Sequence, residues 1–165
     1  MSVALADGHW TKGVSHTLSL GALIDRARAD ALDEEAADIE QVVFNGRYSA
    51  SIHLLAGYAL ELLLKCACYL NGSDENKLKS RALRHDLEGL LDEAEAQGFQ
   101  STVPNVRWIA ERLREPHLSH QFRYGGAEQV VMPELELTFA ALWGLCDELK
   151  EPLELAVAEA SNSMA

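Results

Sequence analysis

The stretch RYSASIHLLAGYALELLLKCACYLNG, residues 47–72, decides the fold. Between Tyr48 and Leu70 only Gly57 disfavours a helix, and these 23 residues would span roughly 34 Å at about 1.5 Å per residue. The helix is apolar on nearly all sides, so other elements have to cover it on more than one side. The sequence therefore predicts a long core helix that ends at an asparagine–glycine pair and carries the packing of an α-helical domain.

Two charged residues, Glu61 and Lys65, interrupt this apolar helix. A membrane span needs about 20 consecutive apolar residues, so we expect no membrane segment here. The two residues stand four apart with the glutamate first, which is the favourable order for an ion pair on a helix. They form either a solvated edge of the core helix or a polar pair that faces a groove, and the sequence favours the solvated edge.

The chain is acidic as a whole but not evenly so. Its 165 residues fit one domain, and 26 acidic against 14 basic residues give a net charge of −12. This balance argues against broad nonspecific binding of nucleic acid, because phosphates would be repelled. Residues 77–123, however, hold eight basic and seven acidic residues, which leaves room for a local basic site.

The termini and the cysteines indicate a cytoplasmic protein. Residues 1–15 lack the apolar stretch of a signal peptide and are expected to be a flexible tail, residues 16–160 to be the single domain, and residues 161–165 to be a second tail. The three cysteines cannot all pair, and they are typical of buried thiols. Because no CxxC, HExxH or other clustered ligand pattern is present, we expect no metal site and no cofactor.

Helical periodicity recurs along the rest of the chain, and no strand-like alternation outweighs it. The patterns predict helices over about residues 18–30, 32–45, 86–97, 104–116 and 133–160. Asp86 is placed to cap the third of these, Pro116 to stop the fourth, and Pro152 to kink or split the last. The predicted fold class is therefore all-α, an up-and-down antiparallel helical bundle.

One segment concentrates side chains that can carry chemistry, namely Arg114, His117, His120, Arg123 and Tyr124. Arginine offers a fixed fork of donors for phosphate, histidine moves protons near neutral pH, and tyrosine stacks on bases. Together these groups could hold and cleave a phosphodiester. By spacing alone the segment is more typical of a solvated connection between helices.

Two further histidines have alternative roles. His85 precedes a predicted helix N-terminus, where anions bind well, and Arg81 and Arg84 are close in sequence. Packing and capping at the start of that helix are the commoner role for such a residue. His53, on the core helix, is more typical of a satisfied core histidine than of a ligand.

Several short motifs in order resemble the HEPN family of prokaryotic helical domains. They are Phe44-Asn-Gly-Arg-Tyr48 before the core helix, Ala59-Leu-Glu61-Leu-Leu-Leu-Lys65 on it, Leu83-Arg-His85-Asp86-Leu87 after it, and Arg123-Tyr124. The family pattern reads nGRy…A…A.E..LK in the first long helix and HdL..Ll at the start of the next. The resemblance runs from about residue 32 to 147.

This resemblance implies a helical bundle that forms a homodimer. Many members are metal-independent ribonucleases of toxin–antitoxin or defence systems, with an arginine followed after four to six residues by a histidine. Arg114 and His120 fit that spacing and would be the catalytic pair, with both copies contributing to one composite site. His85, His117, Arg123 and Tyr124 would bind the nucleotide or RNA. Other members work with a separate nucleotidyltransferase or antitoxin partner.

The sequence thus favours a HEPN-like, nucleotide- or RNA-associated domain, and the enzyme version of this interpretation is a metal-independent ribonuclease. The alternative is a noncatalytic module for dimerisation or protein interaction, built on the core helix and the tryptophan-bearing helices. Whether the chain is an enzyme at all stays open from the sequence.

Overall fold

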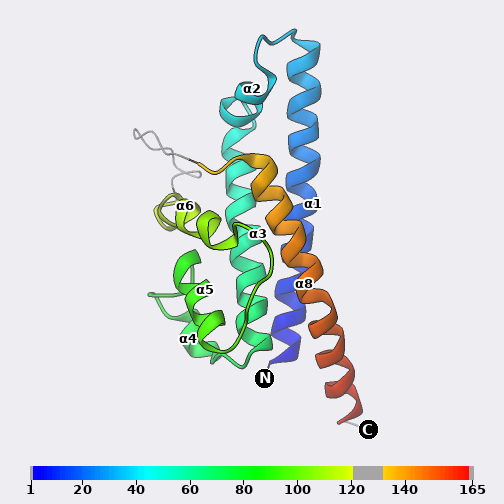
Figure 1. Ribbon diagram of the computed structural model, residues 1–165, viewed down its shortest axis with the longest axis vertical. Coiled ribbons are helices and arrows are strands. Elements are labelled where there is room, and N and C mark those ends of the chain that lie inside the picture. Colours follow the sequence, from blue (N-terminus) through cyan, green and yellow to red (C-terminus); the bar gives the residue numbers. More distant parts are fainter. Residues whose placement is uncertain (1, 121–131, 164–165) are drawn as a thin grey trace.

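The described part of the chain, residues 2–120 and 132–163 of a computed structural model, is helical and contains no strand. The all-α fold class is thereby confirmed for these residues. The helices, shown in Figure 1, are α1 (Val3–Asp33), α2 (Ile39–Asn45), α3 (Ser49–Leu70), α4 (Glu75–Lys79), α5 (Leu87–Ala96), α6 (Val106–Leu118) and α8 (Leu135–Asn162).

The helix α3 is the centre of the bundle, as its sequence predicts. Helices α1 and α8 pack on one side of it and α5 and α6 on the other (Figure 1), and 13 of its 22 residues are buried. It is long and apolar enough to cross a membrane, but 67% of its most apolar window is buried inside the protein. Burial among other helices accounts for its composition, since the core helix of a soluble protein passes the same test.

The direction of the three long helices departs from a simple up-and-down order. Helix α1 runs from the end marked N to the far end of the molecule, and α3 returns beside it (Figure 1). Helix α8 then runs in the same sense as α3. The bundle is therefore antiparallel between α1 and α3, and its short helices α4 to α6 provide the return path.

The predicted flexible tail over residues 1–15 is wrong, because residues 3–15 form the first 13 residues of α1, which has 31. Ala6 is fully buried, and the indole N–H of Trp10 donates to the carbonyl oxygen of Cys146 at 3.0 Å. His9 stacks on the ring of Tyr69 with 5.5 Å between centroids. These contacts come from distant parts of the chain, so no local pattern announces them.

Two prolines expected to stop, kink or split helices lie inside continuous ones. Pro116 lies within α6 and Pro152 within α8. An internal proline removes one backbone hydrogen bond. Around Pro152 the side chains of Leu149 and Leu153 are both buried, so packing on the core keeps the helix continuous.

The remaining boundaries differ mainly at the second helix, which is shorter than expected, and at α4, which occupies part of the predicted loop after residue 72. Asp86 caps α5 as predicted, since its Oδ1 accepts from the backbone N–H of Gly89 at 3.1 Å.

The three cysteines are free and buried, as expected. Burial raises the pKa of both Cys66 and Cys68 to about 12, so neither thiol forms a thiolate near neutral pH. They serve as small core residues.

Candidate functional site

A buried carboxylate on α3, that of Glu61, is the centre of a polar cluster. The side chain of Glu61 is 7% exposed, although every residue within three positions of it on the helix is apolar. Its Oε1 accepts from Nζ of Lys65 at 2.6 Å. The expectation that Glu61 and Lys65 form a solvated edge is therefore wrong, because their side chains are only 7% and 13% exposed. Of the two alternatives, this burial favours the polar pair that faces a groove.

Two histidines from other segments share the second oxygen of this carboxylate. Oε2 of Glu61 lies 3.0 Å from Nδ1 of His85 and 2.7 Å from Nε2 of His117. An ionised carboxylate only accepts hydrogen bonds, so both of these ring nitrogens carry hydrogen. In its neutral form His85 then presents an unprotonated Nε2, which can accept a proton.

Hydrogen bonding keeps Glu61 ionised in spite of its burial. Burial alone raises the pKa of a carboxyl group, but the donors His117, Lys65 and His85 outweigh it and lower the pKa of Glu61 to about 2. The carboxylate is thus negatively charged at any physiological pH.

A glycine on the core helix makes the contact with His117 possible. A Cβ added to Gly57 would lie 2.6 Å from Nδ1 of His117, well inside van der Waals contact. His117 is fully packed between α6 and α3, and its ring meets that of Tyr58 edge-on at 5.4 Å between centroids. The one residue that disfavours a helix in the core stretch therefore clears the space in which His117 reaches Glu61.

Arg114 lies on the same helix as His117 and joins the edge of the cluster through Asp86. Its Nε and Nη2 donate to the two carboxylate oxygens of Asp86 at 2.7 and 2.8 Å. This bidentate pair lowers the pKa of Asp86. Two of the five guanidinium N–H groups are used on Asp86, and a second carboxylate, that of Glu88, lies 3.7 Å from Nε. The side chain is 40% exposed, so its other donors can reach an anion, in competition with these two acids.

His120 follows α6 in a left-handed backbone conformation, with φ of 54°. Its ring centroid lies 5.9 Å from that of His85 and the two rings meet edge-on. His85 in turn lies 6.3 Å from His117. The ring of His85 therefore contacts both His117, at the buried carboxylate, and the partly exposed His120.

Of the six residues predicted for the site, the structure brings together His85, His117 and His120, since the rings of His117 and His120 both lie against that of His85. A fourth predicted residue, Arg114, is joined to this group through Asp86, the residue after His85. The other two, Arg123 and Tyr124, lie outside the described residues. Sequence reasoning missed Glu61 as a member. The available signal was a charged residue in the middle of an otherwise apolar helix, where burial demands a partner.

The cluster also supplies ligands for a metal ion, which the sequence did not lead us to expect. One ligand atom each from Glu61, His85 and His117 lies within 4.8 Å of the others. The three come from two helices and a loop, separated by 24 and 32 positions, so they leave no compact motif. Together with the unused donors of Arg114, the cluster can exchange protons, bind an anion or hold a cation.

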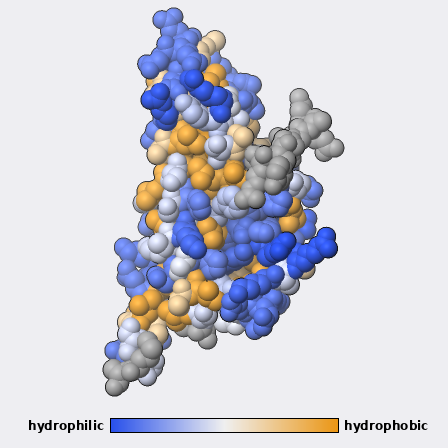
Figure 2. Space-filling view, turned by 180° about the vertical axis from the view of Figure 1, so that it is seen from behind, coloured by the Kyte–Doolittle hydropathy of each residue, from blue (hydrophilic) through white to orange (hydrophobic). Residues whose placement is uncertain are grey.

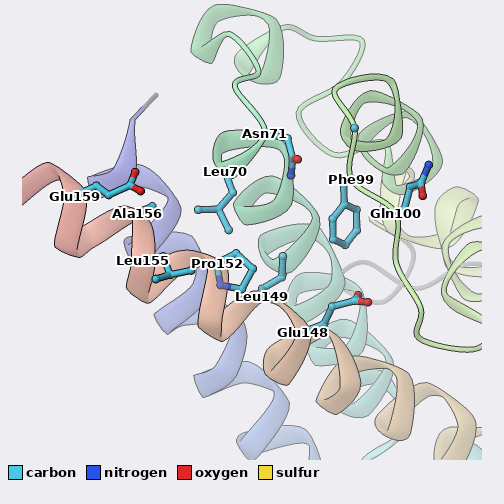
Figure 3. A pocket seen from close by; sticks show the side chains of 11 residues that line it. Leu70, Asn71, Phe99, Gln100, Glu148, Leu149, Pro152, Leu155, Ala156 and Glu159 are labelled. Atoms are coloured by element: carbon cyan, nitrogen blue, oxygen red, sulfur yellow. The ribbon is translucent and has the colours of Figure 1, made fainter.

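A separate pocket of about 430 Å³ lies at the C-terminal end of α3, between that helix, Phe99 and α8 (Figure 3). Leu70, Leu149 and Pro152 form much of its wall. Within residues 2–120 and 132–163, no histidine, lysine or arginine lines it, and its Glu148 already accepts from Ser101 and Thr102. The polar cluster around Glu61 is the better candidate for chemistry.

Comparisons with family models, with curated proteins and with solved structures find no significant match for this chain. The functional argument therefore rests on the site itself.

Proposed function

We propose that this protein is a HEPN-like, nucleotide- or RNA-associated domain whose site is formed by Arg114 and the histidines beside it. The observation that carries this proposal is that the rings of His117 and His120 both lie against the ring of His85. Arg114 stands three residues before His117 on α6 and is held by Asp86, the residue after His85. Arginine with spare donors binds phosphate, and histidine transfers protons at neutral pH. This combination suits a phosphodiester better than a neutral substrate.

In the catalytic form of the proposal, the protein cleaves RNA by transesterification. A histidine, His120 in the first instance, removes the proton of a ribose 2′-hydroxyl, and the resulting oxygen attacks the adjacent phosphorus. The bond from phosphorus to the 5′ oxygen breaks, and that oxygen takes up a proton from a second acid. Arg114 offsets the negative charge that grows on the phosphate oxygens. This chemistry requires no cofactor.

The test is incubation of a single-stranded RNA with the wild-type protein and with His120→Ala and Arg114→Ala. Removal of a general acid or base typically costs about 100-fold or more in rate. Arg112→Ala is the matched control, because Arg112 is an exposed arginine on the same helix that lies over Trp108, 5.9 Å from its ring. Equal products from wild type and His120→Ala, or none from either, would exclude the catalytic form.

The second candidate is a noncatalytic module that associates with a second copy of the chain. Large apolar side chains are exposed on α8 and α6, among them Trp143, Leu137 and Trp108. Figure 2 shows hydrophobic patches between hydrophilic areas on one face of the molecule. Exposed apolar surface of this kind favours association.

Size-exclusion chromatography with light scattering tests whether the chain associates with a second copy. We expect a dimer at micromolar concentration that survives Arg114→Ala and is weakened by Trp143→Ser. A stable monomer would contradict both the dimer and a site composed of two copies. The proposal also includes a separate partner of the nucleotidyltransferase or antitoxin kind. It places the protein in the cytoplasm, where the buried thiols stay reduced.

A further inference from the structure

We infer that Glu61, His85 and His117 form a binding site for one divalent transition-metal ion of the zinc type. The three ligand atoms lie within 4.8 Å of one another, and Oε2 of Glu61 is 3.0 and 2.7 Å from the two ring nitrogens. In a tetrahedral zinc site, bonds of about 2.0–2.1 Å place neighbouring ligands roughly 3.3 Å apart. Small side-chain shifts therefore suffice to admit an ion between them.

The chemistry of the ligand set selects the kind of metal. Two imidazole nitrogens and one carboxylate oxygen suit zinc, cobalt or nickel. Calcium and magnesium prefer six or more oxygen ligands, and this cluster offers too few. Each neutral imidazole can move its hydrogen to the other ring nitrogen, and Glu61 is already ionised. No buried group has to lose a proton to solvent.

Lys65 supports this site by fixing the carboxylate of Glu61. Its Nζ holds Oε1 of Glu61 at 2.6 Å, which leaves Oε2 as the single coordinating oxygen. Carboxylate ligands in metal sites are commonly fixed by a hydrogen bond to their other oxygen. The positive charge of Lys65 opposes a cation, and the net charge of −12 on the chain favours one.

The site is closed on one side and open on the other. The side chains of Glu61 and His117 are 7% and 4% exposed, whereas that of His85 is 34% exposed. Three protein ligands with an open fourth position are the arrangement of catalytic rather than structural zinc sites. The ring of His120 lies 5.9 Å from that of His85, the most exposed of the three ligands. Water or a small anion would complete the coordination at the open fourth position.

The experiment is titration of metal-free full-length protein with Co²⁺, followed by its visible absorption, and then displacement with Zn²⁺. We expect one Co²⁺ per chain with the intense bands of tetrahedral cobalt. Zn²⁺ should abolish these bands, since it binds such sites more tightly than Co²⁺ does. Mg²⁺ and Ca²⁺ at the same concentration should leave the bands unchanged.

Three variants assign the ligands. His85→Ala, at the most exposed ligand, and the isosteric Glu61→Gln should each weaken Co²⁺ binding at least tenfold. His16→Ala is the control, because His16 lies near Tyr58, with 6.0 Å between ring centroids, yet outside the ligand set. Far-UV circular dichroism confirms that each variant is folded.

Absence of tetrahedral cobalt bands in the wild type would overturn the inference, and so would equal Co²⁺ binding by wild type and a folded His85→Ala. No RNA enters this experiment, so its failure leaves the proposed function untouched. Likewise, absence of RNA cleavage leaves the metal site standing.

Discussion

Two buried carboxylates of this protein, Asp30 and Glu61, are held in different ways. Asp30 on α1 accepts from the hydroxyl of Tyr48 at 2.6 Å and pairs with Arg26 and Arg47 at 2.7 and 3.0 Å. Those arginines are 67% and 57% exposed. Glu61 is held by a lysine and two histidines that are themselves mostly out of solvent.

The difference separates a structural tie from a site that can do chemistry. The hydrogen bond from Tyr48 and the two arginines lower the pKa of Asp30, but neither partner type exchanges protons near neutral pH. Asp30 therefore fastens α1 to the start of α3. The histidines around Glu61 can accept protons or ligate a metal. The carboxylate of Glu61 therefore belongs to a group of side chains that can do chemistry, whereas that of Asp30 does not.

The largest expected loss of stability comes from removing each of the two carboxylates, and the two losses should differ. Glu61→Ala leaves the largely buried Lys65 without its partner, and breaking a buried ion pair in this way costs about 3–5 kcal/mol in the free energy of unfolding. Asp30→Ala should cost less, because Arg26 and Arg47 return to water. Urea unfolding followed by circular dichroism measures both, and a greater loss for Asp30→Ala would contradict the distinction.

A smaller loss of stability is expected from substitution of Gly57, which makes room for His117 in the Glu61 cluster. Gly57→Ala places a methyl group against His117, and overpacking of this kind costs about 1–3 kcal/mol. It should also weaken Co²⁺ binding. Gly8→Ala on α1 is the matched control, because no atom lies within 4 Å of the added carbon, and it should stabilise the protein by up to about 1 kcal/mol. Equal stability of the two variants, measured by urea unfolding, would show that His117 does not need the space.

The smallest expected effect is a dependence of the free energy of unfolding on pH that arises from His53. Burial lowers the pKa of His53, whose Nε2 lies 3.2 Å from the carbonyl oxygen of Phe44. The unfolded chain, with a histidine pKa of about 6.5, therefore takes up this proton first. The stability contributed by neutral His53 is complete above that value and is lost as the pH falls, by at most about 1.4 kcal/mol per pH unit.

His53→Gln tests this prediction, since glutamine can still donate to the Phe44 carbonyl. Between pH 7.5 and 5.5 the variant should lose less stability than the wild type in urea unfolding. Both Asp30 and Glu61 have lowered pKa values and stay ionised in this range, so neither contributes to the difference. Identical slopes would mean that His53 is protonated equally in the folded and unfolded chains.

Local patterns predicted much of the helical framework. The core helix begins and ends within one residue of its predicted bounds, and Asp86 caps α5 as its position indicates. These features depend on neighbours in the chain. The helical start of α1 and the continuity of α6 and α8 through prolines depend on packing against distant residues. Local rules therefore gave the wrong answer for the tail over residues 1–15, the stop at Pro116 and the split at Pro152.

By itself, the sequence determined that this chain forms helices around one apolar core helix, and it placed reactive residues on the segment that includes Arg114, His117 and His120. Only the tertiary structure decided that Glu61 lies inside and that His85 and His117 share one of its oxygens. Helical periodicity shows which residues share a face. It does not show which face of one helix meets which face of another, and that meeting creates the cluster.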